Sequence, residues 1–260
     1  MDKMEENMEK IRKWWKGLNK KLFEVSSDEE TSTDYSVETA EQRRSFVFQT
    51  FLELLVFMAM AAVQWVVLLL LPRSETVKAV ERMAPSCIVL FGICLLLFMI
   101  FALSAELRGM HCVNWLLTFC IVEGNILALA VLIILTDLLH MGLGFLMAAL
   151  FVVITVFIAF CMTYDITRNA SFVFLLAFCI FLMSVYGAVL YVMLQVIWPF
   201  CIYAGVVVLM VLPLLLYHVK CVLGNGLVKT SLLDDKLAAL LLFHDFLALF
   251  MLTVYWRPKQ

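Results

Sequence analysis

Two residues in the C-terminal part of the chain have the side chains best suited to chemistry, His218 and Asp245. His218 follows the apolar run Phe200–Tyr217, and Asp245 interrupts the middle of the apolar run Leu237–Trp256. A charged side chain at the centre of a membrane costs roughly 2.5–3.5 kcal/mol on insertion scales, so it is typically paired or functional. If the two side chains meet, an imidazolium and a carboxylate stabilise each other, and the pair responds to pH where histidine titrates.

Further ionisable side chains lie inside the apolar runs. Glu53 and Glu123 fall within the first and third runs, where each is expected to have a partner. His244 precedes Asp245 and points about 100° away from it on an ideal helix, so a bond to a neighbouring carbonyl is expected. Hydrogen bonding between helices, or snorkelling to the interface, is favoured over a functional role for these secondary polar residues.

These residues sit in a chain whose composition is that of a membrane protein. It is 64% hydrophobic and 15% charged, whereas soluble proteins carry roughly 25% charged residues. Seven apolar runs are each near the ~20 residues needed to cross ~30 Å of hydrocarbon. The runs are Phe46–Leu71, Ser86–Ala105, Val113–Thr136, Met141–Met162, Phe172–Gln195, Trp198–Lys220 and Leu233–Trp256. The predicted fold class is all-α, a polytopic membrane protein with a seven-helix domain over residues 46–256 and a short tail, 257–260.

The residues before the first run divide into two predicted segments. Residues 1–23 carry apolar side chains at alternating four- and three-residue steps and a basic face, which predicts a basic amphipathic helix on the cytosolic side. Such a helix, over residues 4–22, suits an anionic lipid surface or calmodulin, and a solvated helix without a specific partner fits equally well. Residues 24–45 are predicted to be an acidic, disordered linker.

The distribution of charged residues and cysteines indicates the orientation in the membrane and argues against several kinds of site. A mild excess of Lys and Arg on one side of the predicted spans favours a cytosolic N-terminus. None of the eight cysteines form C-x-x-C, which argues against a disulfide framework or a zinc site. Asp234 and Asp235 follow a Gly-Asn-Gly turn at 224–226 and are interpreted as helix caps rather than ligands. No cofactor and no nucleic-acid partner are expected.

Several short motifs recur in a characteristic order. They are Arg43–Val47 at the first span, Arg108 with Asn114–Phe119 at the third, Thr163–Thr167 in a loop, and Leu216–Lys220 and Leu242–Leu247 in the last hairpin. In this order, from Arg43 to about Tyr255, they resemble the Bax-inhibitor or lifeguard (transmembrane Bax-inhibitor-motif) family. The chain looks like a divergent member, because its N-terminal segment is a basic amphipathic helix instead of that family's Pro/Gly/Tyr-rich tail.

The resemblance implies a fold and a role. It implies seven helices with the last one central, and residence in the endoplasmic reticulum, Golgi or plasma membrane. It implies a role in restraining cell death and in lowering stored calcium by leak, with two aspartates on the last two helices as a proton-sensitive gate. Asp245 matches the second aspartate, and His218 stands in place of the first. Arg108 matches a basic residue of the family and is therefore a candidate counter-charge for the pair.

The histidine changes the expected chemistry. Two close carboxylates share a proton, whereas a histidine and an aspartate have no such conflict. Calcium prefers several oxygen ligands, so we expect at most weak calcium binding at Asp245. The hypothesis is that protonated His218 clamps Asp245 and neutral His218 releases it.

Two functions stay open at this point. The first is a membrane regulator of cell death and calcium homeostasis that acts as a pH-sensitive calcium leak channel, not an enzyme, with calcium as the permeant ion. The second is a non-conducting protein of the same family that works through membrane protein partners of cell-death or calcium-handling pathways. An intramembrane metal hydrolase is disfavoured because the four histidines do not share a level in the predicted spans. A G-protein-coupled receptor is disfavoured by the expected cytosolic N-terminus.

Overall fold

The computed structural model describes residues 39–134, 136–169, 171–179 and 197–254. The predicted amphipathic helix of residues 1–23, most of the linker 24–45, most of the fifth span Phe172–Gln195 and the tail 257–260 lie outside these residues. The regular secondary structure of the described residues is all helical, without strands, which confirms the all-α class.

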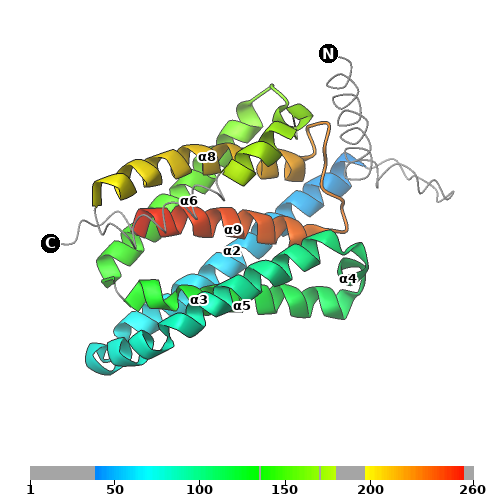
Figure 1. Ribbon diagram of the computed structural model, residues 1–260. Coiled ribbons are helices and arrows are strands. Elements are labelled where there is room, and N and C mark those ends of the chain that lie inside the picture. Colours follow the sequence, from blue (N-terminus) through cyan, green and yellow to red (C-terminus); the bar gives the residue numbers. More distant parts are fainter. Residues whose placement is uncertain (1–38, 135, 170, 180–196, 255–260) are drawn as a thin grey trace, which may run out of the picture. The chain divides into compact units, whose positions relative to one another are not determined.

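The helices follow the predicted apolar runs (Figure 1). They are α2 (Ala40–Leu70), α3 (Arg73–Leu103), α4 (Ala105–Gly109), α5 (His111–Ile134), α6 (Leu138–Cys161), the 3-10 helix η1 (Ile166–Asn169), α8 (Ile197–Leu223) and α9 (Asp235–Val254). Residues 171–179 are also helical.

Four described helices, α2, α5, α6 and α9, are long and apolar enough to cross a membrane. Two others contain shorter apolar stretches, Val89–Leu103 in α3 and Leu209–Leu223 in α8. Large apolar side chains such as Leu103 and Phe157 are 81% and 69% exposed, which is the surface that lipid would cover. The chain is therefore a multi-helix protein of the membrane type, and the count of seven spans stays a prediction.

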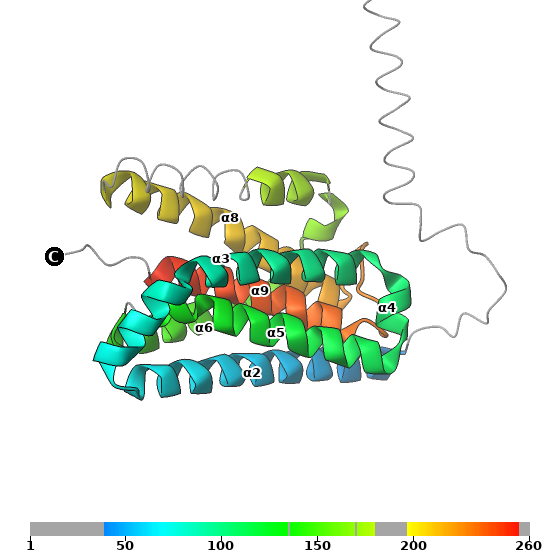
Figure 2. The same cartoon turned by 60° about the horizontal axis from the view of Figure 1, so that its bottom comes forward.

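The last helix lies at the centre of the bundle. α9 packs against α2, α5, α6 and α8, and both views show it running between α8 and α2 (Figures 1 and 2). Ala239, Leu240, Phe243 and Phe246 have no exposed surface. Lipid can cover an apolar helix, but ionisable side chains inside a membrane need partners. Lys236, His244 and Asp245 of α9 find theirs on α2, α5 and α8, which explains the central position of this helix.

Two helices begin earlier than the predicted apolar runs, and the first of them corrects the predicted linker. α2 begins at Ala40, inside the segment 24–45 that was predicted to be a disordered linker, because Arg43 ties its first turn to the bundle. The Arg43 guanidinium donates to the carbonyls of Thr230 at 2.9 Å and Val222 at 3.4 Å. α3 begins at Arg73, well before the predicted span Ser86–Ala105, so the charged residues ahead of that span continue the helix.

The turn between α8 and α9 ends α8 with a left-handed glycine, as the Gly-Asn-Gly sequence predicted. Gly224 has φ 70°, and its N–H donates to the Lys220 carbonyl at 3.1 Å. A β-carbon at this position would lie 2.8 Å from Arg43 Nε. Glycine is thus required at position 224 for two reasons: the positive backbone angle φ and the close approach of the Arg43 side chain.

Candidate functional site

His218 and Asp245 are in contact. The Nδ1 atom of His218 lies 2.6 Å from Oδ2 of Asp245, and the two side chains are only 16% and 7% exposed. His218 stands near the end of α8, and α9 returns alongside it, which brings the middle of α9 to the level of the histidine. Sequence spacing did not determine this contact, because it depends on the rotation of both helices about their axes.

A hydrogen atom must lie between these two atoms for so short a contact. We assign Nδ1–H of His218 as the donor and the Asp245 carboxylate as the acceptor, whether the ring is neutral or charged. Protonation of the second ring nitrogen turns the bond into a charge-assisted one, which is roughly twice as strong as a neutral hydrogen bond. The pair can therefore change the strength of the α8–α9 contact with pH.

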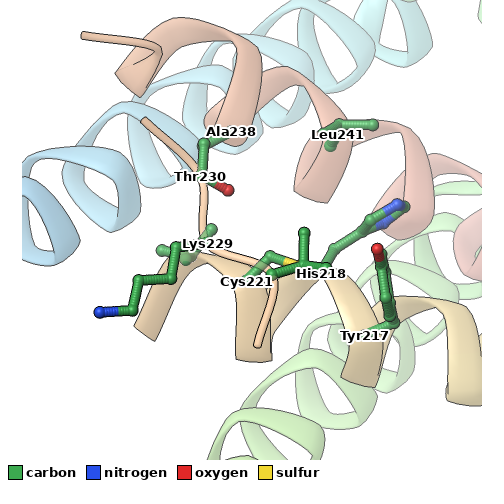
Figure 3. Close-up of a pocket in the computed structure, with 9 residues that line it drawn as sticks. Tyr217, His218, Cys221, Lys229, Thr230, Ala238 and Leu241 are labelled. Carbon is green, nitrogen blue, oxygen red and sulfur yellow. The ribbon is translucent and has the colours of Figure 1, made fainter. Parts of the chain in front are cut away.

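One wall of a cavity is formed by His218 (Figure 3). The cavity has a volume of about 180 Å³ and lies between the end of α8, residues 228–230 and the first turns of α9. Tyr217 and His218 are on one side of it, and Lys229 is on another. A water molecule occupies about 30 Å³ of liquid, so this space has room for several water molecules beside His218.

Arg108 does not serve as the counter-charge of this pair, contrary to the expectation. Its Nε atom donates to Asp234 Oδ1 at 2.8 Å, at the start of α9. One terminal nitrogen donates to the carbonyls of Phe101 at 3.1 Å and Ala102 at 2.5 Å. Arg108 thus binds the last carbonyls of α3, which have no partners within the helix, and joins them to α9. Asp234 lies three helical turns from Asp245, so the arginine cannot reach both.

Glu53 and Glu123 both have partners, as expected for carboxylates inside apolar runs. Glu53 Oε1 accepts from Lys236 Nζ at 3.3 Å, and Lys236 also bonds Asp235 Oδ2 at 3.0 Å. Glu123 accepts from Gln64 Nε2, at 2.8 and 2.9 Å to its two oxygens. In the described residues neither glutamate bonds His218 or Asp245, so these carboxylates form separate contacts between helices.

His244 forms a hydrogen bond with the carbonyl of Leu240 in the preceding turn of α9, as expected. Its Nδ1 lies 2.7 Å from the Leu240 carbonyl, which assigns the hydrogen to that nitrogen. Its Nε2 then accepts from Asn125 Nδ2 at 3.3 Å, and its ring stacks on Phe98 with centroids 4.2 Å apart. His244 therefore connects α9 to α5 and α3 and points away from the His218–Asp245 contact.

The sequence did not lead us to predict that Asp165 and Thr167 hold the α8–α9 loop through hydrogen bonds to Leu227 and Val228. We call these contacts the Asp165 latch. Asp165 Oδ1 accepts from the backbone N–H of Thr167 at 2.9 Å and from its hydroxyl at 2.6 Å, and Oδ2 accepts from the N–H of Leu227 at 2.9 Å. The Thr167 hydroxyl oxygen accepts from the N–H of Val228 at 3.1 Å. Hydrogen bonds from the Thr167 hydroxyl and from backbone N–H groups lower the pKa of Asp165. The Asp-x-Thr spacing is a signal for such a turn, and it was available in the sequence.

The described residues contain no group of three or more His, Cys, Asp or Glu side chains that could hold a metal ion. The His218–Asp245 pair offers one carboxylate and one imidazole. Comparison with known proteins found no family model, no curated protein and no solved structure that matches this chain.

Proposed function

We propose that this chain is a multi-pass membrane protein of the Bax-inhibitor type and that His218 and Asp245 form the pH-responsive gate of a calcium leak pathway. The observation that carries the proposal is the 2.6 Å contact between these side chains on the last two helices, with α9 at the centre of the bundle. Further support comes from Arg43, Arg108 and Asp165, which belong to the motifs that resemble the family and which all hold the α8–α9 loop or its end.

The gate operates through the charge on His218. At acidic pH the imidazolium and the carboxylate, both largely buried, attract each other, and the attraction clamps α8 to α9. At higher pH the neutral ring keeps a weaker hydrogen bond, and the helices separate more readily beside the 180 Å³ cavity. The pathway is therefore closed at low pH and open at higher pH.

Topology, location and role form part of the same proposal. Seven spans with a cytosolic N-terminus follow from the apolar runs and the distribution of basic residues. This topology places the α8–α9 loop and the cavity beneath it on the cytosolic side. Residence in the endoplasmic reticulum, Golgi or plasma membrane, and a role in calcium homeostasis and cell death, rest on the family resemblance.

Calcium efflux from proteoliposomes tests the gate. Efflux from vesicles containing the purified full chain is measured at about pH 6 and about pH 8, which bracket the range where histidine changes charge. We expect faster efflux at the higher pH in the wild type and pH-independent efflux in D245N, which cannot form the ion pair. H218D should show a changed pH response, because two close carboxylates share a proton instead of forming an ion pair. D137N is the matched control, because Asp137 also contacts a histidine, His140, but both side chains are more than 40% exposed. An unchanged pH response in both H218D and D245N would contradict the proposal.

A non-conducting role is the second candidate. Phe243 and Phe246, on either side of Asp245 in α9, have no exposed surface, and the pair supplies one carboxylate where the family has two. Both features disfavour the passage of a hydrated divalent cation. Absence of efflux from the wild-type chain at either pH, with efflux restored in H218D, would establish this second role and direct the search to membrane protein partners.

A further inference from the structure

Buried oxygens without hydrogen-bond partners gather on α2 and α5. Five such side-chain oxygens occur in the described residues, and they belong to Thr50, Glu53, Asn114, Thr118 and Asn125. The first four residues are at most 9% exposed and lie toward the end of the bundle that carries the α8–α9 loop. Leaving a buried acceptor without a donor costs about 1–3 kcal/mol. Buried groups of this kind are commonly satisfied by ordered water or by an ion.

The register of α2 against α5 brings these oxygens to neighbouring levels. Two hydrogen bonds set it: Gln64 donates to Glu123, and Trp65 donates to the Ile126 carbonyl, with sequence separations of 59 and 61 residues.

The same separations place Glu53 level with Asn114. Thr50 is then about one turn nearer the loop end, and Thr118 about one turn deeper. Lys236 of α9 supports this register independently, because its ammonium group contacts Glu53 on α2 and Trp115 on α5. Glu53, Asn114 and the ammonium group of Lys236 thus lie at about one level where these three helices meet, which we call the α2–α5–α9 seam.

A cation already lies at this seam, the ammonium group of Lys236. It is 3.3 Å from Glu53 Oε1, 3.0 Å from Asp235 Oδ2 and 4.3 Å from the centroid of the Trp115 ring. Lys236 is 6% exposed. Two carboxylates and an aromatic face are a typical environment for a desolvated cation. Gln49 Nε2 also donates to Asp235 Oδ2, at 2.7 Å. Glu53 Oε2 accepts no hydrogen bond from Lys236, so the ammonium group leaves one carboxylate oxygen of the site open.

We propose that the α2–α5–α9 seam is a cation-binding site in which Lys236 is a tethered occupant that competes with a divalent cation of the calcium class. The donors are the carboxylates of Glu53 and Asp235, with the unpartnered side-chain oxygen of Asn114 at the level of Glu53. Carboxylate and amide oxygens, completed by water, are ligands that calcium uses in proteins. The site is separate from the His218–Asp245 gate and does not depend on it.

Terbium luminescence tests the site directly. Tb³⁺ also prefers oxygen ligands and emits when a nearby tryptophan is excited, and Trp115 borders the site. The full chain in detergent is titrated with Tb³⁺ and then with Ca²⁺. We expect K236M to bind Tb³⁺ at least about tenfold more tightly than the wild type, because a positive charge a few ångströms away is removed. Ca²⁺ should displace the Tb³⁺, and adding E53Q to K236M should abolish the gain.

Control variants assign the signal to the seam. K229M removes an exposed lysine from the α8–α9 loop and should bind Tb³⁺ as the wild type does. W115F in the K236M background should lose the sensitised emission yet keep a Ca²⁺-induced rise in melting temperature. D245N should leave Tb³⁺ binding unchanged, which separates a failure of this site from a failure of the gate.

Two results of these titrations would contradict the proposal. K236Q serves as a second variant, because it removes the charge but keeps a hydrogen-bond donor for Glu53 if K236M does not fold. If a folded K236M or K236Q shows neither tighter Tb³⁺ binding nor stabilisation by Ca²⁺, Glu53 takes up a proton instead of a metal ion and the proposal is wrong. The same conclusion follows if the gain survives E53Q.

Discussion

Asp165 and Gly226 lie so close together that a β-carbon at position 226 would be 2.6 Å from Asp165 Oδ1. The same β-carbon would also collide with the hydroxyl of Thr167. That hydroxyl cannot move aside easily, because it donates to Asp165 and accepts from the N–H of Val228. The loop before α9, and with it the end of α8 that carries His218, is therefore held by a contact that only glycine permits.

Substituting Gly226 with alanine tests this contact. We expect G226A to lower the free energy of unfolding by about 1–3 kcal/mol, because overpacking forces the bonded side chains apart. Thermal unfolding in detergent measures the change. G142A is the matched control, since a β-carbon at Gly142 meets no atom within 4 Å. Equal stability of the two variants would show that the latch tolerates a β-carbon.

The Asp165 latch should respond to strong acid only. Its pKa is lowered from 3.8 in the folded protein, chiefly by the hydrogen bond from the Thr167 hydroxyl. A lowered pKa means that the stabilisation is complete above the ordinary value of 3.8 and is lost as the pH falls through the lower, folded value. Hydrogen exchange at Leu227 and Val228 should therefore reveal no opening of the latch between about pH 6 and about pH 8, the range where histidine changes charge.

Removing the Asp165 carboxylate should open the latch at any pH. D165N replaces one acceptor oxygen with a donor group that faces N–H groups, so amide exchange at Leu227 and Val228 should accelerate at neutral pH. Asp137 is again a suitable control position, because its contact with His140 is exposed. Unchanged exchange in D165N would mean that the loop is held without this carboxylate.

Arg108 should be essential to stability, although it is remote from the His–Asp pair. The two side chains of its contact with Asp234 are 15% and 19% exposed, and removing one partner of a partly buried charged hydrogen bond costs about 1–3 kcal/mol. We expect R108Q to reach this range, because the α3 carbonyls also lose their donor. A double-mutant cycle with D234N, followed by thermal unfolding, should give a coupling energy of about 0.5–3 kcal/mol. R82Q, at an exposed position of α3, should be neutral.

Gly144 should be needed for the close approach of α6 and α9. A β-carbon there would lie 2.8 Å from Cγ2 of Val254, and the Gly144 carbonyl accepts from the Thr253 hydroxyl at 3.1 Å. Small residues allow membrane helices to pack this closely. G144L should cost about 1–3 kcal/mol through overpacking, measured by thermal unfolding in detergent, whereas G142L should not. Similar melting temperatures for the two leucine variants would place no close contact at Gly144.

The helices were largely predictable because apolar runs bounded by polar residues are a local property of the chain. The third predicted span, Val113–Thr136, differs from α5 by two residues at each end. The turn at Gly224 was predictable for the same reason. The starts of α2 and α3 were not predictable, because both helices extend through polar residues that lie outside the apolar runs. In α2, Arg43 is also held by carbonyl groups that are far away in the sequence.

The partners of the charged side chains were the hardest to predict. Arg108 was expected beside Asp245 and bonds Asp234 instead. Glu53 was expected to have some partner, but nothing in its neighbourhood pointed to Lys236. In each case the two residues lie on different helices, so a rotation of one helix by a single residue, about 100°, would separate them.

The sequence by itself determined that this is a helical protein of the membrane type and that His218 and Asp245 are the side chains to examine. Hydrophobicity and helical periodicity are properties of each segment, and they do not depend on the rest of the chain. Only the tertiary structure decided which polar groups meet: the His218–Asp245 contact, the Asp165 latch and the Lys236 site. These contacts depend on the rotation and register of packed helices, which the local pattern of residues leaves open.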